Sequence, residues 1–178
     1  MTSFTITIQD QGVQAALKEL AARGTNMRAV FHTIGEGIVE RTKRRFETSL
    51  DPAGRPWKPN SAVTLGLFSS SLLGQKSKVN KGGTLNASGR RALANKKPLI
   101  EGGDLRRQFT ISATNGTLTV SNTMEYAAIQ QFGGKAGRGR KVTIPARPFL
   151  PIHQDGSLYP DDQAKILEAI NVYLTDRL

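Results

Sequence analysis

Residues 109–121 read FTISATNGTLTVS, and this stretch decides the fold that we expect. Two runs that alternate apolar and polar residues flank the pair Asn115-Gly116. An Asn-Gly pair between alternating runs is the strongest short-range signal for a β-hairpin. The sequence therefore predicts an antiparallel hairpin in the second half of the chain.

Two longer helices are predicted on either side of this hairpin, because apolar residues recur there at helical spacing. The first covers residues 26–50, and its apolar stripe consists of Met27, Val30, Phe31, Ile34, Ile38 and Phe46. The second covers residues 161–176, and its buried face consists of Ile166, Leu167, Ile170, Tyr173 and Leu174. We expect one α+β domain over residues 1–178, in which a small antiparallel or mixed sheet packs against these two helices.

Shorter elements complete the prediction. Alternation of Phe4, Ile6 and Ile8 favours a strand at residues 2–8, and Asp10 is placed to cap a helix at residues 11–23. The apolar stripe of that helix is Val13, Ala16, Leu17, Leu20 and Ala21. Further helical turns are expected at residues 104–107 and 125–132, and a strand at residues 142–144.

Two glycines lie inside the long predicted helix. Gly35 and Gly37 each weaken a helix by up to about 1 kcal/mol relative to alanine. We expect them to allow another helix or subunit to approach closely.

Residues 61–98 lose this periodicity and are rich in Ser, Gly, Asn and Lys. An apolar patch comes first and a basic run follows it. Structureless stretches of this length are usually functional or disordered. We therefore predict a long flexible arm inserted into the domain. Its cations are Lys76, Lys78, Lys81, Arg90, Arg91, Lys96 and Lys97.

The formal net charge of the 178 residues is +11, which favours a polyanion or an acidic protein surface as partner. The charge is unevenly distributed: residues 35–107 carry +9, residues 135–147 carry +5 and residues 152–178 carry −3. Identical subunits with such an asymmetry are suited to meet head-to-tail, as ring formation requires.

A second basic segment, residues 135–141, holds Lys135, Arg138, Arg140 and Lys141 among small residues. Such a loop binds DNA phosphates through counterion release, contacts an acidic neighbouring subunit, or only serves solubility. It contains no aromatic residue to stack on bases, which argues against a single-strand binder.

Signs of catalysis are nearly absent from the sequence. There is no cysteine, and His32 and His153 are far apart and outside any metal-ligand motif. We read the acidic residues of the C-terminal segment, Asp162 among them, as first-turn dipole partners and a solvated helix face. The expectation is a protein that is not an enzyme and has no cofactor, metal or catalytic residue.

No membrane partner is expected either. No uncharged stretch exceeds 17 residues, and the one at residues 59–75 includes four serines, whereas a membrane span needs about 20 apolar residues. The first residues lack the pattern of a signal peptide, and the absence of cysteine fits a reducing cytoplasm.

Trp57 and the run Pro148-Phe149-Leu150-Pro151 are open to two interpretations. They are binding hot spots, or they anchor turns to the core, and we favour anchoring.

Three segments, taken in order, carry a resemblance. They are Asp51-Pro52-x-Gly54-x-x-Trp57-x-Pro59, residues 125–134 (EYAAIQQFGG) and residues 144–150 (IPARPFL). Together with residues 98–106 (PLIEGGDLR) and the C-terminal helix, they resemble the phage virion morphogenesis family, the Mu-like tail completion proteins. The residues that match this pattern are Asp51, Pro52, Gly54, Trp57, Pro59, Tyr126, Gln131, Phe132, Gly133, Gly134, Pro145, Arg147, Pro148, Phe149 and Leu150.

The resemblance implies a structural protein that completes the tail or joins it to the head-side connector through subunit contacts. It implies a homo-oligomeric ring, other tail or connector proteins as partners, assembly in the host cytoplasm and a place in the virion. The alternative that the residues leave open is a DNA-binding accessory protein that uses the basic arm and the Arg-Gly loop for non-specific contacts. A nuclease is disfavoured because it needs clustered carboxylates to hold a metal.

Overall fold

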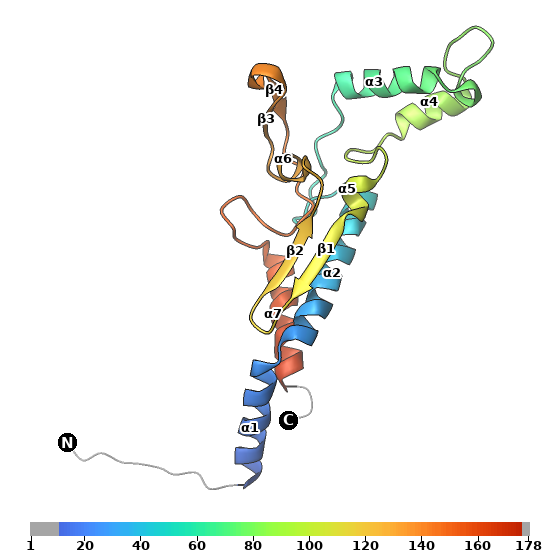
Figure 1. The fold of residues 1–178 in the computed structure, drawn as a ribbon. Helices are drawn as coiled ribbons and strands as arrows, with labels where there is room; N and C mark the ends of the chain where they lie inside the picture. The colour runs from blue at the N-terminus through green and yellow to red at the C-terminus, as the bar shows by residue number, and fades with distance from the viewer. Residues whose placement is uncertain (1–10, 176–178) are drawn as a thin grey trace.

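The computed structural model describes residues 11–175, so the strand expected at residues 2–8 and the cap expected at Asp10 lie outside the described part. The body consists of the hairpin β1 (Phe109–Ala113) and β2 (Leu118–Asn122), laid on α2 (Arg28–Thr48) and α7 (Pro160–Thr175) (Figure 1). α1 (Gln11–Thr25) extends beyond this body at one end. The α+β class, the hairpin and both long helices are confirmed.

The hairpin has the expected antiparallel register, from Phe109 opposite Asn122 to Ala113 opposite Leu118. Its residues alternate between half-buried and exposed, which leaves Thr110 and Ser121 to share a hydrogen bond of 2.8 Å on the outer face. The turn is tied to the helix layer, since the Asn115 side chain accepts a hydrogen bond from the backbone N–H of Arg28.

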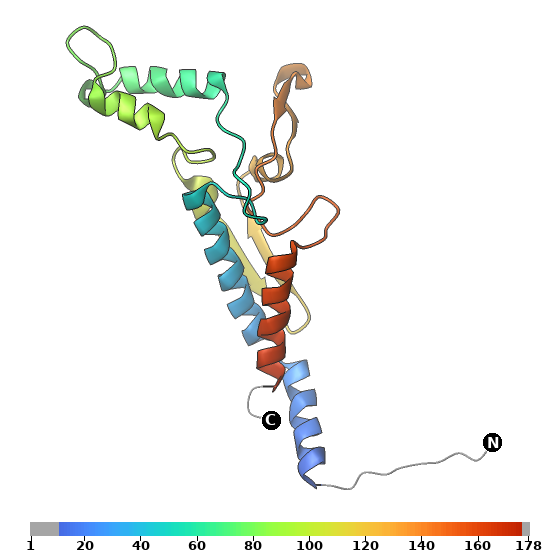
Figure 2. The same cartoon turned by 180° about the vertical axis from the view of Figure 1, so that it is seen from behind.

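The core of the body lies between the hairpin and the two helices. Met27, at the start of α2, and Val30, Ile34 and Ile38 within it are buried there, as the predicted stripe requires. α7 contributes Ile166, Ala169, Ile170, Tyr173 and Leu174. The prediction was wrong for Leu167, whose exposed fraction is 59%, because α7 turns that side away from α2. Leu17 is likewise 61% exposed, because α1 projects past the body (Figure 2).

Gly35 permits a close approach, but the approaching element differs from the expected one. A β-carbon there would lie 2.7 Å from Ile111 Cγ2 and 3.0 Å from Leu118 Cδ1. The hairpin of the same chain therefore occupies this place, rather than another helix or subunit. At Gly37 only the Arg41 side chain lies nearby, at 3.2 Å.

The arm, residues 61–98, is not a structureless loop. It folds into α3 (Ala62–Leu73), the 3-10 turn η1 (Lys76–Lys78) and α4 (Ala87–Ala94), which project from the end of the body opposite α1 (Figure 1). Each helix starts at a polar cap: Ser61 accepts from Thr64 N, and Asn86 accepts from Gly89 N. Both helices are short and contain glycine, and the apolar residues of α3 do not gather on one side, so the sequence carries no clear helical signal there. Mobility of the arm stays a prediction.

The basic loop forms the tip of a second hairpin. β3 (Gly134–Ala136) pairs with β4 (Val142–Ile144), and the turn η2 (Arg138–Arg140) joins them. The strand at residues 142–144 is confirmed, whereas β3 is a strand that the sequence reasoning missed. We call residues 134–144 the basic hairpin; it projects at the same end of the body as the arm (Figure 1). The short helices α5 (Asp104–Arg107) and α6 (Ala127–Phe132) lie where they were expected.

Candidate functional site

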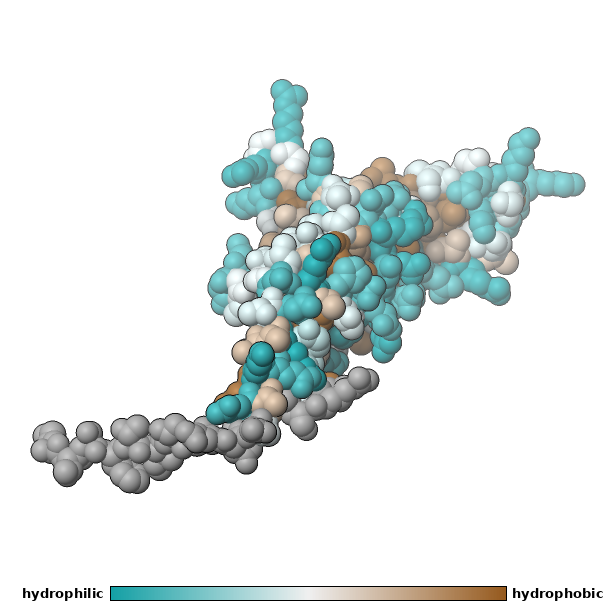
Figure 3. Space-filling model, turned by 60° about the horizontal axis from the view of Figure 1, so that its bottom comes forward, coloured by the Kyte–Doolittle hydropathy of each residue, from teal (hydrophilic) through white to brown (hydrophobic). Residues whose placement is uncertain are grey.

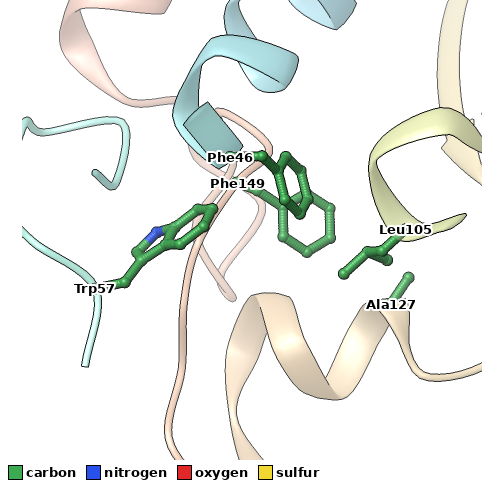
Figure 4. Packing of buried hydrophobic residues seen from close by; sticks show 5 residues of the cluster. All are labelled: Phe46, Trp57, Leu105, Ala127 and Phe149. Atoms are coloured by element: carbon green, nitrogen blue, oxygen red, sulfur yellow. The ribbon is translucent and has the colours of Figure 1, made fainter. Parts of the chain in front are cut away.

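The three segments that carry the family resemblance meet in space. Residues 51–59, helix α6 and residues 144–152 surround a cluster formed by Phe46, Trp57, Leu105, Ala127 and Phe149 (Figure 4). The Phe46 ring lies 5.4 Å from the Trp57 ring and 5.3 Å from the Phe149 ring, and both phenylalanines are fully buried. We call this region the motif junction.

The first segment is a turn held by one carboxylate. Asp51 accepts hydrogen bonds from the backbone N–H groups of Ala53 and Arg55 through Oδ1, and from Arg55 Nε through Oδ2. Gly54 adopts a φ of +77°, which favours glycine. The turn delivers Trp57 to the core, where its indole N–H donates to the Pro148 carbonyl at 2.8 Å.

Gln131 holds the extended third segment. Its side-chain oxygen accepts from the backbone N–H groups of Phe149 and Leu150, and its side-chain nitrogen donates to the carbonyls of Leu150 and Ile152. The residue is 2% exposed. Buried backbone groups outside a ladder need such partners, so this one side chain satisfies a stretch that prolines exclude from regular structure.

Arg147 and Gly133 complete the contacts between the three segments of the motif junction. The Arg147 guanidinium donates to the carbonyls of Lys58 and Pro59 at 2.7 and 2.8 Å, and burial lowers its pKa. At Gly133 a β-carbon would lie 2.9 Å from the Ala146 backbone nitrogen, and φ is +75°. Most matching residues therefore build the fold; Tyr126 and Phe132 keep exposed fractions of 43% and 37%.

A buried ion cluster that sequence reasoning missed joins α2 to α7. Asp162 is 1% exposed and accepts from Arg41 Nε at 2.7 Å and from Arg45 Nη2. Arg45 also donates to the Phe149 carbonyl at 2.9 Å, which links the cluster to the motif junction. Asp162 lies in the first turn of α7, as expected, but the expectation of a solvated face was wrong for it. The available signal was the spacing of four between Arg41 and Arg45, which puts both on one helix face.

The eleven cations predicted as contact residues lie on the two projections. Nine are exposed, and Lys78 and Lys96 are half-buried. Two fix the base of the arm: Lys96 donates to the Ile100 carbonyl and lies over the Phe68 ring, and Lys97 donates to the Glu47 carbonyl. Within residues 11–175 none of the eleven forms an ion pair with a carboxylate. Both projections end in hydrophilic side chains (Figure 3).

The two histidines lie in unrelated surroundings. His32 is exposed beside Glu36, at 3.6 Å, and His153 stacks on Tyr159 with ring centroids 3.8 Å apart. Asp155 accepts from the hydroxyl and backbone N–H of Ser157, and these hydrogen bonds lower its pKa. Over the described chain, no three His, Asp or Glu side chains gather as a metal site would need.

Between residues 11 and 175, no helix combines the length and apolar character needed to cross a bilayer.

These features define a class: a small α+β scaffold, rigid at a junction of buried motifs, that extends two cation-rich projections. The model of the phage virion morphogenesis family matches residues 8–175, so the chain belongs to this family. The resemblance drawn from the sequence is thereby confirmed, and the protein has a structural or assembly role in a phage virion.

A curated relative is the "Mu-like prophage FluMu G protein 2" of Haemophilus influenzae. It is 50% identical over 76 residues, which cover 43% of this chain and 51% of the relative. The match thus spans about half the length of that relative. No solved structure matches the chain.

Proposed function

We propose that this protein completes the phage tail or joins it to the head-side connector, acting as a homo-oligomeric ring through subunit contacts. The observation that carries the proposal is the set of eleven cations without carboxylate partners in the described chain, gathered on two projections at one end of a rigid body. Unpaired exposed charge steers association and selects partners of opposite charge. The protein does this work without catalysis or a cofactor.

The relative's printed name, which refers to a Mu-like prophage, supports the proposal. So does the contrast in anchoring: the body is held by buried rings and ion pairs, whereas the arm is joined to it mainly through its base. We propose that the arm and the basic hairpin become fully ordered on contact with neighbouring subunits or tail proteins, so that binding and ordering are coupled.

Limited proteolysis tests the coupling. The free protein is expected to be cut first between residues 70 and 98, where Lys81 precedes the exposed glycines Gly82 and Gly83. In assembled particles the same sites should be protected from cleavage. Cleavage first within α2 of the free protein would contradict the proposal.

Complementation tests the function itself. A phage in which this gene carries a nonsense mutation should accumulate filled heads and separate tails, and the purified protein added to that lysate should restore infectious particles. Absence of tails altogether, or no rescue by folded protein, would overturn the proposal.

Non-specific DNA binding is a second candidate, favoured by the placement of all eleven cations at one end. A gel-shift titration over salt distinguishes the two, because phosphate contacts give a steep salt dependence. Tight binding at physiological salt favours the DNA function. Binding that vanishes by about 150 mM salt leaves ordinary polycation behaviour.

A further inference from the structure

Helix α3 is an apolar helix that its own molecule covers on one side. Its twelve residues contain no charged side chain, and Leu72 is the buried one. Val63 is 73% exposed, Leu67 70% and Leu73 45%. Val63 and Leu67 are four residues apart and therefore adjoin on the helix surface. The exposed side of α3 also carries Thr64, Ser70 and Ser71, so its apolar part is the patch around Val63 and Leu67. Exposed apolar patches mark interaction sites.

A groove suited to an apolar helix lies toward the other end of the molecule. It follows the seam between α2 and α7, measures about 580 Å³, and is lined largely by Ala29, Val30, Ala169, Val172 and Tyr173. Val172 is 55% exposed. Figure 2 shows α2 and α7 in front of the hairpin, so the hairpin covers their opposite side.

The charges around the two surfaces are complementary. Residues 61–98 carry seven cations and no acidic residue. The groove itself is lined by one acidic and one basic residue, Glu168 and Lys165. The exposed charged residues of α2 and α7 are five acidic and four basic ones, a net of −1: Glu36, Glu40, Glu47, Asp161 and Glu168 against Arg28, Lys43, Arg44 and Lys165. Glu40 is paired with Arg44 of the same helix.

We propose that α3 of one copy binds in the α2–α7 groove of the next copy, with the arm's cations against the acidic residues of α2 and α7. The two surfaces lie at opposite ends of one molecule and cannot meet within it (Figure 1). Such a heterologous contact closes into a ring or extends as a filament. The proposal rests on the proposed function only in that copies of the chain assemble.

Two charge substitutions test the contact on purified protein. Leu67→Asp places a charge on the apolar surface of α3, and Val172→Asp places one in the groove. Because both side chains are exposed, the circular dichroism spectrum of each variant should match that of the wild type. Each variant alone should lose self-association at least about tenfold, measured by analytical ultracentrifugation. Mixing them should restore one contact per pair, from the arm of the Val172→Asp chain to the groove of the Leu67→Asp chain. The mixture therefore forms 1:1 dimers and nothing larger.

Cross-linking gives an independent readout, because the chain has no cysteine. A chain with both Leu67→Cys and Val172→Cys should form a ladder of disulfide-linked oligomers on oxidation. A matched chain with Leu67→Cys and Ser121→Cys, on the outer face of the hairpin, should not extend beyond dimers.

Three results would overturn the proposal. They are a wild-type chain that stays monomeric at its highest soluble concentration, a Val172→Asp chain that associates normally, and Leu67→Cys chains that cross-link to each other as readily as to Val172→Cys. The first places another virion protein on α3, and the last indicates a symmetric arm-to-arm contact. None of these assays uses phage particles, so their failure is separate from failure of complementation.

Discussion

The motif junction and the arm were both singled out from the sequence, the first for its family motifs and the second for its cations, and their side chains differ sharply in exposure. At the motif junction Trp57, Gln131, Arg147 and Phe149 are buried and bonded within the chain. On the arm the cations are largely exposed, and Val63 and Leu67 of α3 are 73% and 70% exposed. The difference teaches that the residues of the three motifs build the scaffold, whereas the side chains of the projections remain exposed, as the proposed contacts require.

The largest stability effect is expected at the centre of the motif junction. Phe149→Ala removes a fully buried ring that contacts Phe46 and Phe109, and should cost about 3–5 kcal/mol of unfolding free energy. Leu67→Ala on the arm, where the side chain is 70% exposed, should cost less than about 0.5 kcal/mol. Urea denaturation measures both, and similar losses would erase the contrast.

The second largest loss of unfolding free energy is expected when the buried ion cluster is broken. Asp162→Asn leaves Arg41 and Arg45 without their carboxylate and should cost about 3 kcal/mol, the low end for a broken buried pair because Arg41 keeps 24% exposure. The neighbouring variant Asp161→Asn, at an exposed site, is the matched control and should change stability by less than about 0.5 kcal/mol. Equal losses of unfolding free energy for Asp162→Asn and Asp161→Asn would show that the buried ion cluster does not stabilise the fold.

Two glycine substitutions in α2 should have smaller effects on stability, and these effects should be opposite in sign. Gly35→Ala forces a methyl group against Ile111 and Leu118 and should destabilise by about 1–2 kcal/mol. Gly37→Ala meets only the movable end of Arg41 and should stabilise by up to about 1 kcal/mol through helix propensity. Two stabilising substitutions would mean that the hairpin does not press on α2.

Much of the body was predictable because its signals are local. Asn115-Gly116 predicts the hairpin turn, and the stripe from Met27 to Phe46 predicts which side of α2 is buried. The partners of Asp162 and Gln131 were not predictable in this way, since each bonds to residues brought together by the fold. Helix α3 was missed because its apolar residues do not gather on one side, and helix α4 because its eight residues are too few for a periodic pattern to stand out.

The smallest stability effect is expected on the arm's cations. Lys76, Lys81 and Arg91 are exposed, and replacing all three with glutamine should change the unfolding free energy by less than about 0.5 kcal/mol. A variant with Lys18→Gln, Lys43→Gln and Lys58→Gln removes the same charge from exposed sites outside the arm. Both variants should unfold at the same temperature as the wild type. A lower unfolding temperature of the arm variant alone would mean that its cations stabilise the fold.

The same pair of variants tests the division between scaffold and contact most directly, through the yield of infectious particles in lysate complementation. The arm variant is expected to lose at least about tenfold in yield, while the control variant matches the wild type. Full activity of the arm variant, or an equal loss in both, would contradict the account.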